Sequence, residues 1–261
     1  MRDFYAPSQP MPLDQAHGLR QMFAASRQRV LPVAANPHVP FSGGVLDQMT
    51  AVLVARGHRV LVVDAADRSP APPEMALIDL AQCIEPLSAQ VGYLAARGLP
   101  LAHVDTRGSA SGFLDAIAEA APQADAVILH ANPTDLGRMF MRRPARPMLI
   151  GSEDAESIKH TYAACKLLAQ RCRLMTFDLL LSAEPGSRRA AEVAARLASC
   201  ADGFIGAVRH DWAVSDPASG PHDAPGPALD RLLAAQMALA PDAMPVPAPA
   251  RGAAAARAQT N

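Results

Sequence analysis

The residues best placed to bind phosphate are 36–43, which follow a short apolar run at 29–35 and read Asn-Pro-His-Val-Pro-Phe-Ser-Gly. In a parallel α/β sheet, the turn after the first strand is where a nucleotide usually sits. A working phosphate loop needs glycines that let the backbone wrap the phosphates, a lysine that neutralises them and a hydroxyl residue that binds magnesium. This turn has neither lysine nor arginine, and Pro37 and Pro40 each remove a backbone N–H donor.

The missing donors decide how much affinity this turn could provide. A hydrogen bond to a charged group contributes about 1.5–3 kcal/mol, so the loss of three or four of them would lower nucleotide affinity by many orders of magnitude. The sequence therefore predicts no catalytic residues and no bound cofactor at this turn. ATP with magnesium would be a ligand only if another part of the chain replaced the loop.

Other sequence patterns are weaker candidates for chemistry. Asp105–Gly112 is a small, hydroxyl-rich turn before a predicted helix, which could bind an anion with help from Arg107, although a capped turn is the plainer interpretation. A small-molecule enzyme that uses this turn is one alternative. The eight histidines form no H-x-x-x-H pair on a helix, and the four cysteines form no C-x-x-C pair, so we expect no metal site.

Hydrophobic patterning indicates alternating strands and helices around these turns. The continuous apolar run 59–64 (RVLVVD) is typical of a strand that is buried on both faces. The predicted strands are 29–35, 59–64, 101–105, 126–130, 147–150, 174–181 and 203–208. The predicted helices are 14–25, 44–56, 76–83, 86–97, 112–121, 154–171, 186–200 and 227–239. This alternation predicts an α/β fold with three layers and a mostly parallel sheet.

Length and composition predict one domain with two tails. The 261 residues suit an α/β domain at 29–240, a mobile N-terminal segment at 1–28 and a disordered tail rich in proline and alanine at 241–261. The net charge of −1 does not favour nucleic acid as a partner. The first residues do not resemble a signal peptide, and no apolar stretch is long enough to span a membrane, so we expect a cytoplasmic protein.

The stretch Arg29–Asp64 resembles the opening of the MinD/ParA ATPases, especially those of the FlhG type. In that family a strand, a GKGGVGKT-type loop, a helix and an RVLLLDAD-type strand follow with similar spacing. The resemblance places Pro37 at the signature lysine of the loop, Ser42 at the second lysine and Gly43 at the magnesium threonine, with Asn36 as the first loop residue. It thus implies a P-loop NTPase-like fold with a degenerate nucleotide loop.

Two strands and one helix continue this resemblance. Asp64 matches the first aspartate of the family's DAD motif, and Ala66 stands at the second. His130 falls at the position of a catalytic-site aspartate. Ser157–Tyr162 (SIKHTY) resembles the family's SITDAY helix. The family's pattern of elements is therefore present without the side chains that its ATPases use.

The N-terminal segment carries the most specific resemblance. It matches the DQAxGLR motif of FlhG proteins at Asp14, Gln15, Ala16, Gly18, Leu19 and Arg20. The resemblance implies that this motif contacts FlhF, an SRP-type GTPase, and stimulates its GTP hydrolysis. Gln15 could position water and Arg20 could neutralise charge near a phosphate. The plainer interpretation is an ordinary helix packed on the domain edge.

The resemblance favours a regulator of flagellar number or placement that acts through FlhF and basal-body components and does not hydrolyse ATP. One alternative is an active but divergent ATPase in flagellar assembly, cell-pole positioning or partitioning, and another is a relative that serves cellulose synthesis. FlhG and MinD proteins carry a C-terminal amphipathic helix, so the helix 227–239 could make weak contact with the inner membrane. Its single basic residue, Arg231, favours packing on the domain instead.

Overall fold

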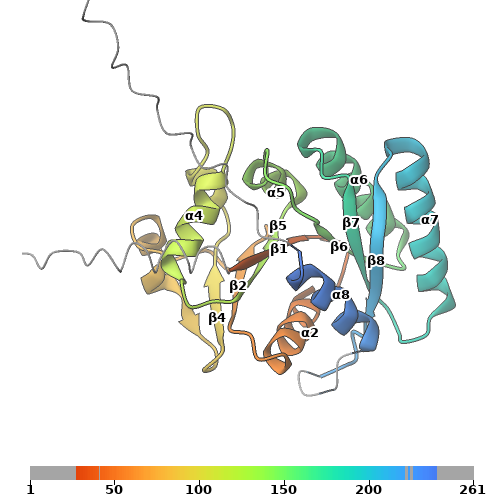
Figure 1. The fold of residues 1–261 in the computed structure, drawn as a ribbon, viewed down its shortest axis with the longest axis horizontal. Helices are drawn as coiled ribbons and strands as arrows, with labels where there is room; N and C mark the ends of the chain where they lie inside the picture. Colours follow the sequence, from red (N-terminus) through yellow and green to blue (C-terminus); the bar gives the residue numbers. More distant parts are fainter. Residues whose placement is uncertain (1–27, 41, 221–222, 224–225, 240–261) are drawn as a thin grey trace, which may run out of the picture.

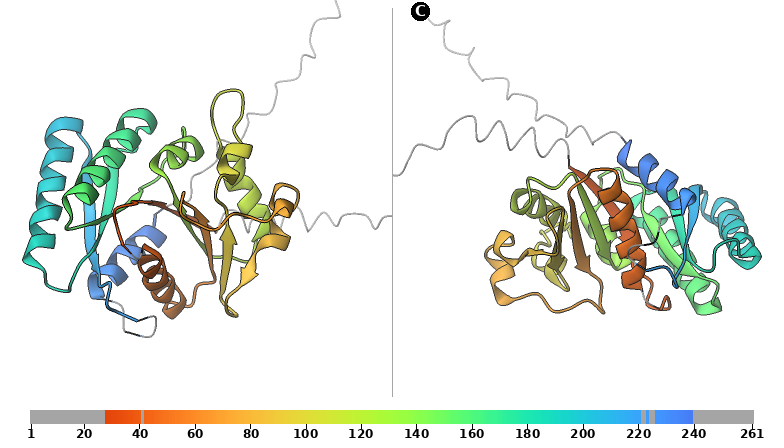
Figure 2. Two further views of the ribbon diagram at one scale, coloured as in Figure 1. Left: turned by 180° about the vertical axis from the view of Figure 1, so that it is seen from behind. Right: turned by 90° about the horizontal axis from the view of Figure 1, so that it is seen from below.

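The computed structural model describes residues 28–40, 42–220, 223 and 226–239, which form one sheet with helices on both faces (Figures 1 and 2). The sheet has eight strands in the order β3-β4-β2-β5-β1-β6-β7-β8. The strands are β1 (Arg29–Ala34), β2 (Val60–Ala65), β3 (Glu85–Pro86), β4 (Val91–Ala95), β5 (Ala126–Ala131), β6 (Met148–Ser152), β7 (Thr176–Ser182) and β8 (Val208–Ser215). Every neighbouring pair is parallel except β3 with β4.

The sheet has a hydrophobic core on each face, between its strands and the helices that cover that face. Along β2, Val60 and Val62 belong to one core, whereas Leu61 and Val63 belong to the other. Helices α2 (Ser42–Ala55) and α8 (Pro227–Met237) cover the first core and lie side by side (Figure 1). Helices α4 (Ser111–Ala120), α5 (Pro133–Met139), α6 (Ala155–Cys172) and α7 (Arg188–Ile205) cover the second. The predicted three-layer α/β fold is confirmed.

The central strand β1 contains a proline, and a segment that contains proline is rarely found as a central strand of a sheet. Pro32 is in register with Leu129 of β5, but β6 pairs with β1 only at Val33 and Ala34. The missing N–H of Pro32 therefore costs no hydrogen bond to β6.

Helix α6, predicted at 154–171, runs from Ala155 to Cys172 and so differs by one residue at each end. The Asp154 carboxylate accepts the N–H groups of Ser157 at 3.2 Å and Glu156 at 2.8 Å, and these bonds lower the pKa of Asp154. At the other end, Arg173 adopts a left-handed conformation with φ of 58°. The Asp154 cap fixes the start of α6 beside the ends of β1 and β6.

Two predicted elements between residues 86 and 105 are wrong. The predicted helix 86–97 instead overlaps the end of β3 and contains β4, because Val91–Ala95 pairs along β2 and tertiary pairing outweighs its helical spacing. The predicted strand 101–105 is the end of the short helix α3 (Leu99–Ala102) followed by a turn. Gly98, with φ of 80°, directly precedes α3, and Pro100 suits the first helical turn.

Smaller corrections concern boundaries. The predicted strand 203–208 is wrong, because α7 continues to Ile205 and Gly206 (φ of 71°) ends it before β8 starts. The predicted helix 76–83 is two short 3₁₀ helices, η1 (Glu74–Leu77) and η2 (Ala81–Cys83). Helix α5 was not predicted, because its seven residues give too short a pattern to recognise.

Candidate functional site

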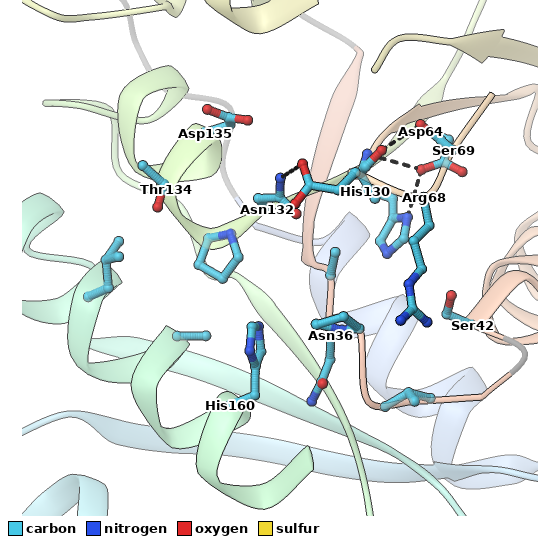
Figure 3. A pocket seen from close by; sticks show the side chains of 18 of the residues that line it. Asn36, Ser42, Asp64, Arg68, Ser69, His130, Asn132, Thr134, Asp135 and His160 are labelled. Atoms are coloured by element: carbon cyan, nitrogen blue, oxygen red, sulfur yellow. Dashed lines mark hydrogen bonds and ion pairs between the residues drawn. The ribbon is translucent and has the colours of Figure 1, made fainter. Parts of the chain in front are cut away.

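A cavity of about 630 Å³ opens at the carboxyl edge of the sheet, where β1, β2 and β5 end (Figure 3). Strand β1 leads through α2 to β2 on one side, whereas β5 leads through α5 to β6 on the other. In open α/β sheets, ligands bind where the strand order reverses in this way. The cavity is therefore the leading candidate for a functional site within the described part of the chain.

Asn36 is a buried anchor at the floor of this cavity. Its Nδ2 lies 3.0 Å from both the carbonyl and the hydroxyl oxygen of Ser157, and 3.1 Å from Thr161 Oγ1 and from the Ile150 carbonyl. Figure 3 shows the amide directed away from Asp64 and His130. The first residue of the predicted loop thus joins β1 to β6 and α6 rather than facing a ligand.

The residues after Asn36 close a tight turn. The N–H of His38 donates to Asn36 Oδ1 at 3.0 Å, and the N–H of Val39 donates to the Asn36 carbonyl at 3.1 Å. The Val39 side chain is buried in the core beneath α2. Pro37 and Pro40 have no N–H to offer. From 37 to 40, each backbone N–H is therefore either absent or already bonded within the turn.

Replacing Asn36 by alanine should lower the free energy of unfolding by about 2–3 kcal/mol, because the Ser157 and Thr161 oxygens and the His38 N–H would lose a buried partner. Urea denaturation measures this loss. The matched control is Asn132→Ala, whose amide donates to the exposed Asp67 at 2.6 Å. Equal effects from the two variants would contradict the anchoring role.

Asp64 and His130 form a cross-strand pair above this turn. They are in register on β2 and β5, and Asp64 Oδ1 lies 2.9 Å from His130 Nδ1. The imidazole is buried, and its Nε2 has no hydrogen-bond partner among the described residues. The predicted site residue Asp64 thus lies at the cavity together with His130.

Arg68 is a cavity residue that the sequence did not single out. It follows β2 by three residues, is exposed and is directed toward Ser42 in Figure 3. The ion pairs found among the described residues do not include it, whereas Arg138 at the same cavity pairs with Asp135 at 3.0 Å. Its position just beyond the carboxyl end of a buried strand was the signal that could have identified it.

His160 lines the cavity on the side away from Arg68 (Figure 3). Its ring meets that of His38 edge to face, with centroids 5.8 Å apart. Burial lowers the pKa of His160, and the neighbouring His38 lowers it further. His160 belongs to the SIKHTY segment, whose Ser157 and Thr161 hold Asn36, so this segment serves the turn directly.

The remaining predicted residues divide into three groups. Ser42 and Gly43 begin α2 and line the cavity with Pro37. The motif residues Asp14, Gln15, Ala16, Gly18, Leu19 and Arg20 lie outside the described residues. In the Asp105–Gly112 turn, Asp105 Oδ1 accepts the N–H groups of Arg107 and Ser109, so the turn is closed by its own side chain. No cluster of three or more potential metal ligands occurs in the part of the chain that is described.

Helix α8 packs its apolar face on the domain. Leu229, Leu232 and Leu233 are buried against the core beneath α2, and Arg231 pairs with Asp211 of β8 at 3.0 Å. This arrangement supports domain packing, rather than membrane contact, for the predicted helix 227–239, which ends at Met237. None of the described helices combines the length and apolar character needed to span a bilayer.

Comparisons with known proteins agree with this architecture. No protein-family model and no curated protein matches the sequence. A putative plasmid partition protein from Borrelia burgdorferi B31 bound to AMPPNP is 8% identical, with a TM-score of 0.55 over 81% of this chain and 96% of that one. Another structure of a B. burgdorferi plasmid partition protein is also 8% identical, with a TM-score of 0.53 and the same coverage. A complex of Cyanothece McdA with ATP is 14% identical, with a TM-score of 0.50 over 73% of this chain and 85% of that one. At these identities the likeness establishes the fold alone: this chain has the α/β fold of these plasmid partition protein and McdA structures.

Proposed function

We propose that this protein regulates flagellar biosynthesis, setting flagellar number or placement through the FlhF GTPase, and that it does so without hydrolysing ATP. The DQAxGLR motif at residues 14–20 and the MinD/ParA-type fold support this function. In this proposal the α/β domain is a scaffold in the cytoplasm that presents the N-terminal segment to FlhF and to basal-body components. Neither ATP nor magnesium is needed for it to act.

The turn at 36–40 is the observation that carries the loss of ATPase activity. A phosphate loop binds through free backbone N–H groups and a lysine. Here Pro37 and Pro40 lack N–H groups, the N–H groups of His38 and Val39 already donate to Asn36, and the turn contains neither lysine nor arginine. Loosening this turn to wrap a triphosphate would break the Asn36 anchor and expose Val39.

Titration calorimetry with ATP and magnesium tests this step. We expect no heat of binding with ATP at millimolar concentration, and no ATP-dependent rise in melting temperature. The melting temperature reports binding because a ligand that binds only the folded state stabilises it by mass action. Micromolar binding of ATP would contradict the proposed loss of nucleotide binding. It would not decide whether the protein acts on FlhF, which needs a separate test.

A divergent ATPase is the second candidate, and the cavity with Arg68 favours it. Arg68 could supply, from the segment after β2, the positive charge that the turn lacks, and Asp64 could bind a metal ion. This alternative predicts magnesium-dependent turnover that Arg68→Ala abolishes and that the exposed control Arg97→Ala does not change. Under our proposal, the wild-type protein and both variants show no turnover.

A further inference from the structure

Exposed apolar side chains gather near the end of the sheet that carries β3 and β4. Ile78 is 84% exposed and Leu77 is 67% exposed at the end of η1, while Leu101 and Val104 are exposed on α3 and just after it. Helices η1 and α3 pack against each other, so these four side chains lie on adjoining elements. Together they are named the η1–α3 patch. Single exposed apolar residues are ordinary, but a patch of them indicates a surface that something covers.

The rim of the η1–α3 patch carries acidic groups. Glu74 and Asp79 flank Leu77 and Ile78, and neither forms an ion pair with any described residue. The Gln82 side chain donates to Asp79, and this bond lowers the pKa of Asp79 and keeps it ionised. The chemistry that fits this surface is an apolar segment with basic residues beside it.

The chain supplies such a segment before its first strand. Residues 13–25 place Leu19, Met22 and Phe23 at helical spacing, so that the three share one side. Arg20 adjoins them, and Arg27 follows, whereas Asp14 is the one acidic residue between 13 and 27. The segment therefore matches the patch in both apolar character and charge.

The anchor at Gln28 lets this segment reach the patch. Gln28 Nε2 donates to the carbonyls of Ala121 at 2.9 Å and Ala124 at 3.4 Å, just beyond the end of α4. The ten residues of α4 lead back from this anchor toward the turn that follows Val104, a length of about 15 Å. The nine residue-to-residue steps from Leu19 to Gln28 cover about 14 Å as a helix and up to about 30 Å when extended.

We propose that residues 13–25 dock on the η1–α3 patch and that this contact restrains the segment. Leu19 and Arg20 then make contacts in the docked state that a partner would also need. If the proposed function holds, FlhF must displace the segment from the patch before the motif can act on GTP. The patch thus sets how readily this chain engages its partner.

Disulfide trapping in the full chain tests the docking directly. The background carries Cys200→Ser, because Cys200 is the exposed cysteine among the four. In Leu19→Cys with Leu101→Cys, docking raises the effective thiol concentration, and we expect an intramolecular disulfide to form about tenfold faster than in the control pair. The control is Leu19→Cys with Phe204→Cys, since Phe204 is 81% exposed at the end of α7, next to β8 at the other end of the sheet. Equal rates would overturn the proposal, and so would a disulfide-linked dimer as the main product.

A second variant tests the same contact without cysteines. Ile78→Glu with Leu101→Glu alters two side chains that are more than half exposed, so the fold should be kept. We expect trypsin to cleave after Arg20 about tenfold faster in this variant, because the lost apolar burial releases the segment. Unchanged cleavage would contradict docking.

The functional consequence is measured separately. The same double variant should stimulate FlhF as strongly as the free peptide 1–28, whereas the wild-type chain stimulates less. If trapping succeeds but neither the peptide nor the variant affects FlhF, the docking stands and the proposed function fails. If the peptide stimulates FlhF but trapping fails, the proposed function stands and the docking proposal fails.

Discussion

Replacing Asp178 by alanine should lower the free energy of unfolding by about 3–5 kcal/mol, because the change leaves a buried arginine without its counter-ion. Asp178 is fully buried on β7, and its Oδ2 accepts Arg146 Nε at 2.9 Å and Gln236 Nε2 at 2.7 Å. Its Oδ1 lies 3.0 Å from the N–H of Asp211 and 3.2 Å from His210 Nδ1. One carboxylate therefore joins β7 to β8, to the chain entering β6 and to α8.

Urea denaturation measures this loss, and hydrogen exchange locates it. Because Gln236 belongs to α8, amides of that helix should exchange faster in Asp178→Ala than in the wild type. Asp230→Ala is the matched control, since it removes an α8 carboxylate that pairs with Arg56 at the surface and is screened by water. If the two variants unfolded at similar urea concentrations, Asp178 would not be the junction described above.

This junction also shows what sequence patterns do not reveal. The run 174–181 predicts a buried strand from its apolar residues, and β7 confirms it, but a charged residue in its middle has no visible partner in the sequence. Arg146, His210 and Gln236 are 32 to 58 residues away from Asp178. Only the folded sheet brings them together, so the sequence could predict the strand and not the network that holds α8.

The strands and the turn that line the cavity were more predictable. Continuous apolar runs at 59–64 and 126–130 identify strands buried on both faces, and these strands bring Asp64 and His130 to one edge in register. The sequence of the turn shows directly that it lacks lysine and contains two prolines. That Asn36 turns inward depends on Ser157 and Thr161, which are more than 120 residues away. Its role as an anchor therefore required the structure.

The errors occurred where local preference and tertiary pairing disagree. Residues 91–95 carry helical spacing but pair with β2, because the edge of a sheet offers a continuous row of backbone partners. Short helices such as α3 and α5 contain too few residues for a period to be visible. These elements border the cavity and the η1–α3 patch, so the regions most relevant to function were the hardest to predict.

A peptide of residues 1–28 should accelerate GTP hydrolysis by FlhF, and Arg20→Ala should remove most of that acceleration. An arginine that neutralises charge in a phosphoryl-transfer transition state contributes about 10³–10⁵ in rate, so even partial engagement predicts a loss of about a hundredfold or more. Single-turnover hydrolysis measures this step separately from product release. Gln15→Ala should also lower the rate if the amide positions water.

Arg27→Ala provides the matched control, because it removes the same charge from the same segment outside the DQAxGLR motif. A general electrostatic attraction between the segment and FlhF would make the two variants equivalent and would weaken as salt is raised. A specific role for Arg20 instead predicts that saturating peptide cannot rescue Arg20→Ala, whereas it does rescue Arg27→Ala. Wild-type stimulation by Arg20→Ala would exclude Arg20 from the chemistry and leave the segment, at most, a docking role.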